Sequence, residues 1–212
     1  MFLSLLALTA HAKACATDDG LEFWVNPSAS FTVDGDREFE IETAQRLRNA
    51  SDGRADTYFG RLWLHQKLAT GATVSGAVER RVNDGGTDEK RLMQQVSTRH
   101  GVVKTRFRLE QRFVDGAERA GLRLRPRIGV AIPLGDEGRW SFRSDAELFL
   151  TLQSTSRTGD EGLTGLRTQI GFGYELSDRV SLSAGYLRQQ DIVAGRPDTV
   201  GHAPIIAIDY AF

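Results

Sequence analysis

The feature that most constrains the fold of this chain is a two-residue alternation of apolar and charged side chains. One face of residues 103–113 carries Val103, Thr105, Phe107, Leu109, Gln111 and Phe113. All five intervening residues are charged: Lys104, Arg106, Arg108, Glu110 and Arg112. A helix would spread these two classes around its circumference, whereas a strand places alternate residues on opposite faces. The segment is therefore predicted to be a strand with one apolar and one charged face.

The same period recurs along most of the chain from Leu21, most clearly over 122–132, 140–152 and 166–176. Turn-forming runs rich in Gly, Asp and Ser separate these segments, and short connections alternate with longer ones. We expect strands near 21–33, 37–49, 57–69, 72–82, 90–99, 102–114, 120–133, 139–153, 163–176, 179–190 and 202–212.

This pattern predicts an all-β fold: a closed antiparallel up-and-down transmembrane β-barrel of ten to twelve strands over residues 21–212. Lipid offers the backbone no hydrogen-bond partners, so strands cross it only in a closed barrel. The mean hydropathy of -0.33 does not oppose this, because a barrel presents only alternate residues to lipid. The eleven segments conflict with the even strand number of single-chain bacterial barrels. Either one strand is missing from the prediction or the first is not a full member of the wall, so ten and twelve are both open.

The charged face is predicted to point inward, because an Arg facing lipid at mid-membrane costs about 2–4 kcal/mol. Acidic residues on the same faces offset the arginines, so we expect a paired network, since unpaired buried charge is expensive. Its predicted members are Arg106, Arg108, Glu110, Arg112, Arg123, Arg125, Arg127, Arg143, Asp145 and Glu147. Two interpretations remain open: structural filling of the barrel, or an Arg-lined, porin-like narrow channel.

The N-terminal residues are typical of a targeting segment. An apolar run from Phe2 to Leu8 precedes two small-residue cleavage patterns, which predicts a signal peptide over 1–14. The run lacks a preceding Lys or Arg, so a signal peptide truncated at its start remains an open alternative. A net charge of -1 provides no field for nucleic-acid binding, and the single Cys excludes a disulfide framework and a four-Cys zinc site. No cofactor or metal is expected.

The chain ends in a further alternating segment that includes Ile208, Tyr210 and Phe212. With Trp140 and Tyr174, its aromatic residues fall near predicted short-turn ends, where an interfacial girdle would place them. A terminal Phe after such alternation is common in outer-membrane barrels. By that resemblance these three residues form an assembly signal, and the barrel-insertion machinery is an expected partner.

Several pieces of the chain resemble the domain of unknown function 2490 family, a family of uncharacterised outer-membrane barrels. The likeness lies in the hexapeptide at 108–113, the Arg-rich strand ending in Pro133-Leu134, the acidic strand at 145–149, and the segments 171–174, 185–187 and 210–212. The resemblance implies a barrel in the outer membrane of a Gram-negative bacterium, in contact with lipid and lipopolysaccharide. It implies no activity.

The sequence does not predict an enzyme. None of the His residues after the leader has a Ser two positions on, and the Gly-x-Ser-x-Gly motif is absent. His65 is expected to join the interior network. Two alternatives remain: an outer-membrane lipid-modifying enzyme that uses Asp145 or Glu147, and a soluble periplasmic ligand-binding barrel with inverted faces. Inversion would place the apolar set inside: Phe107, Leu109, Leu122, Leu124, Leu148, Ile170 and Phe172.

Overall fold

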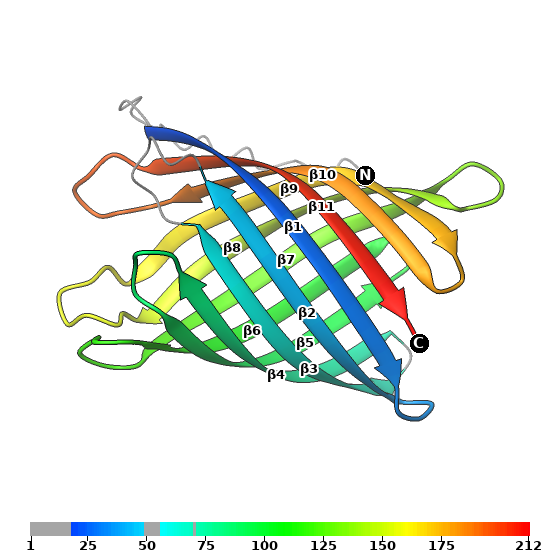
Figure 1. The fold of residues 1–212 in the computed structure, drawn as a ribbon, viewed down its shortest axis with the longest axis horizontal. Coiled ribbons are helices and arrows are strands. Elements are labelled where there is room, and N and C mark those ends of the chain that lie inside the picture. Colours follow the sequence, from blue (N-terminus) through cyan, green and yellow to red (C-terminus); the bar gives the residue numbers. More distant parts are fainter. Residues whose placement is uncertain (1–17, 49–55, 70) are drawn as a thin grey trace, which may run out of the picture.

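The computed structural model describes residues 18–48, 56–69 and 71–212 as an all-β fold (Figure 1). Its strands are β1 (Asp18–Thr32), β2 (Arg37–Arg48), β3 (Thr57–Ala69), β4 (Ala72–Asn83), β5 (Glu89–His100), β6 (Val103–Val114), β7 (Gly121–Leu134), β8 (Trp140–Gln153), β9 (Gly162–Ser177), β10 (Val180–Asp191) and β11 (Thr199–Ala211). These residues contain no helix, and so none that is long and apolar enough to cross a membrane. The predicted signal peptide, 1–14, lies outside the described residues.

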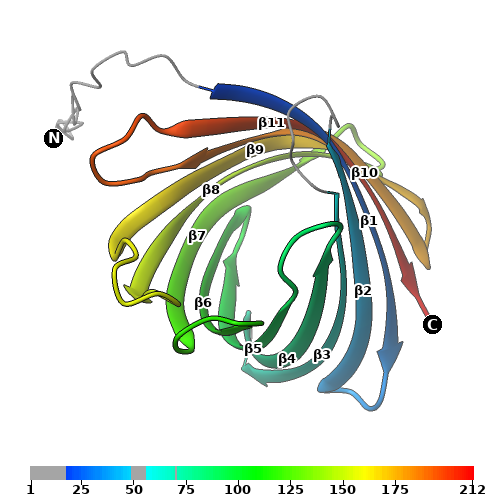
Figure 2. The ribbon, with the colours of Figure 1, turned by 60° about the vertical axis from the view of Figure 1, so that its left-hand side comes forward.

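Every predicted strand is present. The bounds differ most at the starts of β1 and β11, which begin at Asp18 and Thr199 rather than at 21 and 202. The predicted and observed strands agree because a two-residue alternation of charged and apolar side chains separates the two classes onto opposite faces only in a strand. The strands run obliquely around one interior and close into a barrel (Figures 1 and 2).

The described barrel has eleven strands, within the predicted range of ten to twelve. Two details of the predicted topology are wrong: β1 is a full member of the wall, paired with β2 on one side and β11 on the other, and the pairing is not wholly antiparallel. In an up-and-down barrel with an odd strand number, the first and last strands point the same way. The β1–β11 seam is therefore parallel, with Trp24 opposite Ile205 and Ser30 opposite Ala211, so the barrel is mixed rather than wholly antiparallel.

The connections sort by length to the two ends of the barrel (Figure 1). Among the described connections, turns of at most five residues at 33–36, at Gly71, and at 101–102, 135–139 and 178–179 lie at one end, and loops of five to eight residues at 84–88, 115–120, 154–161 and 192–198 lie at the other. Gly71 shows how tight a short turn is. Its φ is 80°, and a Cβ there would lie 2.6 Å from the carbonyl oxygen of Arg99.

The apolar side chains form the outer face of the barrel. Phe107 is 57% exposed and Phe172 50%, although both are large and apolar. Leu92, Ile128, Leu148 and Ile170 are exposed in the same way. The charged residues between them, such as Arg108, Arg125 and Glu147, are buried inside. This orientation is the opposite of the one that the inverted-face alternative requires.

Candidate functional site: the charged interior

A continuous series of ion pairs crosses the interior from β2 to β9. In strand order it runs through Glu42, Arg61, Glu79, Arg91, Glu110, Arg125, Glu147 and Arg167. The Arg125 guanidinium is its best-paired cation, since Nη1 lies 2.6 Å from Glu110 and Nη2 lies 2.7 Å from Glu147. Alternation places several charges on the inner face of strands such as β6, β7 and β8, and the barrel brings opposite signs together across neighbouring strands.

Aromatic side chains fill the space between these charges. Trp24, Phe59, Trp63 and Phe149 are all buried, and each lies beneath at least two guanidinium groups. The closest is Arg46, whose Cζ is 3.8 Å from the centroid of the Trp24 ring. The ring faces attract the cations, so these aromatic side chains hold the guanidinium groups in place around the two interior cavities.

The sequence-predicted network residues have different surroundings. Five lie in the connected series or bond directly to it: Arg106, Glu110, Arg123, Arg125 and Glu147. Arg112 is joined to the series through Glu89, which pairs with Arg91. Arg127 and Asp145 form a separate pair. Arg143 donates to Ser141 and lies 3.9 Å from Glu175. Arg108 has no carboxylate within ion-pair distance among the described residues, and it donates only to the side-chain oxygen of Gln95, at 3.0 and 2.9 Å.

Several central residues were absent from the predicted network. Arg91 and Arg167 belong to the connected series, Glu89 pairs with Arg91, and Arg46 lies near the series with no carboxylate partner in the described chain. The charged faces of β2 and β5 are less continuous, because the buried, uncharged Ala44 and Met93 interrupt them. Strand parity nevertheless identifies them: Glu89 and Arg91 share the inner face of β5 with Gln95, and Arg167 lies opposite Glu147.

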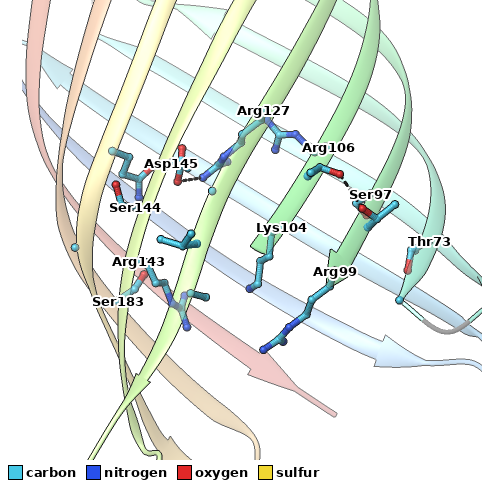
Figure 3. A pocket seen from close by; sticks show the side chains of 18 of the residues that line it. Thr73, Ser97, Arg99, Lys104, Arg106, Arg127, Arg143, Ser144, Asp145 and Ser183 are labelled. Atoms are coloured by element: carbon cyan, nitrogen blue, oxygen red, sulfur yellow. Dashed lines mark hydrogen bonds and ion pairs between the residues drawn. The ribbon is translucent and has the colours of Figure 1, made fainter. Parts of the chain in front are cut away.

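A cavity of about 900 Å³ occupies the short-turn end of the interior; we call it the vestibule (Figure 3). Small residues, including Gly171, Ser183 and Gly185, form part of its wall on β9 and β10. The strands β3 and β5 to β8 contribute its cations: Lys67, Arg99, Lys104, Arg106, Arg127 and Arg143. The acidic residues in its lining are Asp36 and Asp145, so the vestibule is basic.

A smaller cavity of about 280 Å³ lies deeper and shares Arg106, Arg127, Gln169 and Ile205 with the vestibule; we call it the inner cavity. Its lining includes eight arginines, at positions 46, 61, 81, 106, 108, 125, 127 and 167. The four carboxylates in the lining are Glu40, Glu42, Glu147 and Asp209. Cations therefore outnumber anions two to one around this space.

A hydroxyl, an imidazole and a carboxylate form a hydrogen-bonded chain beside the network, contributed by Ser75, His65 and Glu40. His65 Nδ1 is 2.8 Å from Ser75 Oγ, and its Nε2 is 3.0 Å from a carboxylate oxygen of Glu40. These are the groups of a nucleophilic triad. Ser75, however, is 3% exposed and lines neither cavity, and its strand position commits the nearby backbone N–H groups to the sheet. The arrangement holds His65 inside the charge network.

The described residues contain no group of three or more His, Cys, Asp and Glu side chains placed to hold a metal ion.

The predicted assembly residues lie on or just after β11, at the short-turn end. Ile208 is exposed on the outer face, and Phe212 stacks on Phe31 with ring centroids 4.5 Å apart. Tyr210 packs against Phe212 at 4.4 Å, while Trp140 and Tyr174 meet at 4.6 Å on β8 and β9. Phe212 thus packs the end of β11 against Phe31 on β1.

No curated protein matches the chain. Residues 21–200 match the family described as protein of unknown function (DUF2490), and this match covers β2 to β10 entirely, with most of β1. With the closed barrel already in view, this match establishes that the chain belongs to the DUF2490 family.

Proposed function

We propose that this protein is an integral outer-membrane β-barrel of a Gram-negative bacterium, a structural scaffold whose interior is closed by its ion-pair network. The observation that carries the proposal is the distribution of side chains. Large apolar residues are exposed over the outer wall, and no helix among the described residues covers them. Monomeric soluble proteins rarely expose an apolar surface of this extent, whereas lipid favours it.

Strand length supports the same environment. The strands contain 12 to 16 residues. At about 3.3 Å per residue and a tilt of about 40°, 12 residues rise about 30 Å, enough for the apolar band of about 25 Å in outer-membrane barrels. Short turns on one side and long loops on the other are typical of barrels with periplasmic turns. In the proposed orientation, the vestibule opens to the periplasmic side.

The membrane location is tested by placing a charge on the outer wall. Ile170 lies near the middle of β9 and is 49% exposed. In a bilayer, Ile170→Arg should destabilise the refolded barrel by about 2–4 kcal/mol. Thr158→Arg, in the exposed β8–β9 loop, is the matched control and should be neutral. Equal stability of both variants in phospholipid vesicles would contradict lipid contact, since a water-facing Arg costs little.

The closed interior favours a scaffold over an open channel. Met93 and Glu110 are fully buried on β5 and β6 and line neither cavity, and with the Glu89–Arg112 pair they occupy the part of the interior toward the long-loop end, while the fully buried Leu187 and Glu147 line the inner cavity itself. In a planar bilayer, the purified barrel should therefore give no steady current. A steady ohmic conductance would instead support the narrow-channel alternative.

A lipid-modifying enzyme is the second alternative, and the series Ser75, His65 and Glu40 is the observation that favours it. We expect no catalysis from it, because Ser75 is buried away from both cavities. Asp145 and Glu147 are held by Arg127 and by Arg125 and Arg106. Their carboxylates therefore serve as counter-ions. Phospholipid hydrolysis by the purified barrel that is lost in Ser75→Ala would establish the enzyme instead.

A further inference from the structure

Two arginines of the inner cavity, Arg46 and Arg108, have no carboxylate within ion-pair distance among the described residues. Arg46 is 8% exposed and Arg108 is 6% exposed. Each of the other six arginines that line this cavity has a carboxylate within 4 Å. No such carboxylate lies near Arg46 or Arg108 within the described segments, and Arg108 is bound only by the neutral Gln95. The excess charge of the interior is therefore concentrated at these two side chains.

Unsatisfied polar atoms gather at the same place. Among the described residues, four buried side-chain polar atoms lack a hydrogen-bond partner: Asn26 Oδ1, Arg46 Nε, Arg106 Nε and Asp145 Oδ1. Asn26, Arg46 and Arg106 all line the inner cavity. Two of these atoms are guanidinium N–H donors. Buried donors are nearly always satisfied in folded proteins, so two in one cavity point to a missing acceptor.

The surroundings of Arg46 make an anion the appropriate acceptor. Arg46 and Arg167 lie over the same Trp24 ring, at 3.8 and 5.0 Å, so two cations share one aromatic side chain. Arginine keeps its charge in proteins, so burial cannot be relieved by losing the proton. A buried cation is tolerated when it is paired and hydrogen-bonded. A bound counter-ion would supply both the opposite charge and the hydrogen-bond acceptors.

We propose that the inner cavity is a binding site for a small oxyanion that bears a phosphoryl or carboxylate group, held chiefly by Arg46 and Arg108. Guanidinium groups recognise carboxylate and phosphate with paired N–H donors, which a spherical ion does not match. A cavity of about 280 Å³ admits inorganic phosphate or a short dicarboxylate and excludes a lipid or a polymer. The site stands on the interior geometry and goes beyond the proposed membrane scaffold.

The vestibule provides the route to this site. Arg99, Lys104 and Arg143 extend into it from three neighbouring or near-neighbouring strands (Figure 3). Lys67 and Lys104 form no ion pair among the described residues, and Arg99 donates to the backbone oxygen of Gly101. A cleft lined by one sign of charge concentrates the opposite ion and speeds its entry. The glycine and serine wall on β9 and β10 keeps this space open.

Calorimetry on the refolded full chain in a non-ionic detergent tests the site without requiring a membrane. Inorganic phosphate and succinate are titrated separately at constant ionic strength, with chloride as the background salt. We expect saturable binding, with one site per barrel, of at least one of the two oxyanions. Tryptophan fluorescence should change with the same midpoint in a Trp140→Phe background, since Arg46 stacks on Trp24 and Arg108 lies over Trp63.

The variants Arg46→Gln and Arg108→Gln should each weaken binding roughly tenfold or more, because a charge-assisted hydrogen-bond pair is lost. Arg80→Gln is the matched control: Arg80 is exposed, pairs with Asp88 and lines neither cavity. Lys104→Ala should slow association of the oxyanion, and it should lower the affinity much less than Arg46→Gln or Arg108→Gln does. Heat-modifiable migration in gels verifies that each variant folds.

Absence of saturable binding by either oxyanion in the wild-type barrel would overturn the proposal, whatever the variants do. Unchanged affinity in folded Arg46→Gln and Arg108→Gln would overturn it as well. These outcomes differ from a failure of the membrane proposal, which the Ile170→Arg comparison in vesicles reports independently.

Discussion

Glu110 is the position where a single conservative change should cost the barrel most. Its side chain is fully buried and lies 2.6 Å from Arg125, 2.9 Å from Arg123 and 3.7 Å from Arg91. Glu110→Gln preserves shape and one acceptor oxygen but removes the charge. Arg125 keeps Glu147 and Arg91 keeps Glu89, whereas Arg123 loses its only carboxylate partner among the described residues.

The expected loss is about 3–5 kcal/mol of unfolding free energy, because breaking a buried pair leaves an uncompensated charge. Glu161→Gln is the matched control. Its pair with Arg119 is also 2.9 Å long but is exposed, so its loss should cost about 0–1 kcal/mol. Urea unfolding of both variants in detergent micelles, followed by tryptophan fluorescence, gives the two values. A loss below about 1 kcal/mol for Glu110→Gln, equal to the control, would refute the view that the network stabilises the interior.

Three further outcomes follow from local geometry. Gly71→Ala should cost about 1–3 kcal/mol, because its φ of 80° is strained for Ala and the new Cβ would contact Arg99 O, whereas Gly35→Ala has open space and should be neutral in the same unfolding assay. A fluorophosphonate probe should leave the barrel unlabelled, since Ser75 is buried; labelling that Ser75→Ala abolishes would show the opposite. Phe212→Ala should lower the yield of heat-modifiable barrel in cells more than Phe113→Ala does, because Phe212 stacks on Phe31 across the β1–β11 seam; equal yields would contradict a role in closure or assembly.

Most of the wall could be predicted from sequence because a strand's period is local information. The segment at 103–114 illustrates this, since its charged residues alone fix which side of β6 points inward. The parallel seam could not be predicted in the same way. The seam is parallel only if the total number of strands is odd and β1 pairs with β11. No local pattern in either strand indicates these two conditions.

The sequence could predict which charged residues lie on the inner face of each strand, but not which of them form ion pairs with one another. Parity placed Arg106 and Glu147 on inner faces, yet their ion pair joins β6 to β8 across β7, which depends on the stagger of the closed barrel. Arg46 was missed because its strand has inward Ala44 in place of a continuous charged face. The deficit of acids around Arg46 and Arg108 becomes visible only when ten strands contribute side chains to one cavity.

The central claim is that the outer wall faces lipid and the charged face lies within. The three tryptophans test it directly, because Trp140 is 51% exposed on the outer wall while Trp24 and Trp63 are buried inside. In vesicles of brominated phospholipid, the wild-type barrel should lose the emission of Trp140, and Trp140→Phe should be nearly unquenched. Strong quenching that persists in Trp140→Phe would place Trp24 or Trp63 against lipid and contradict the account.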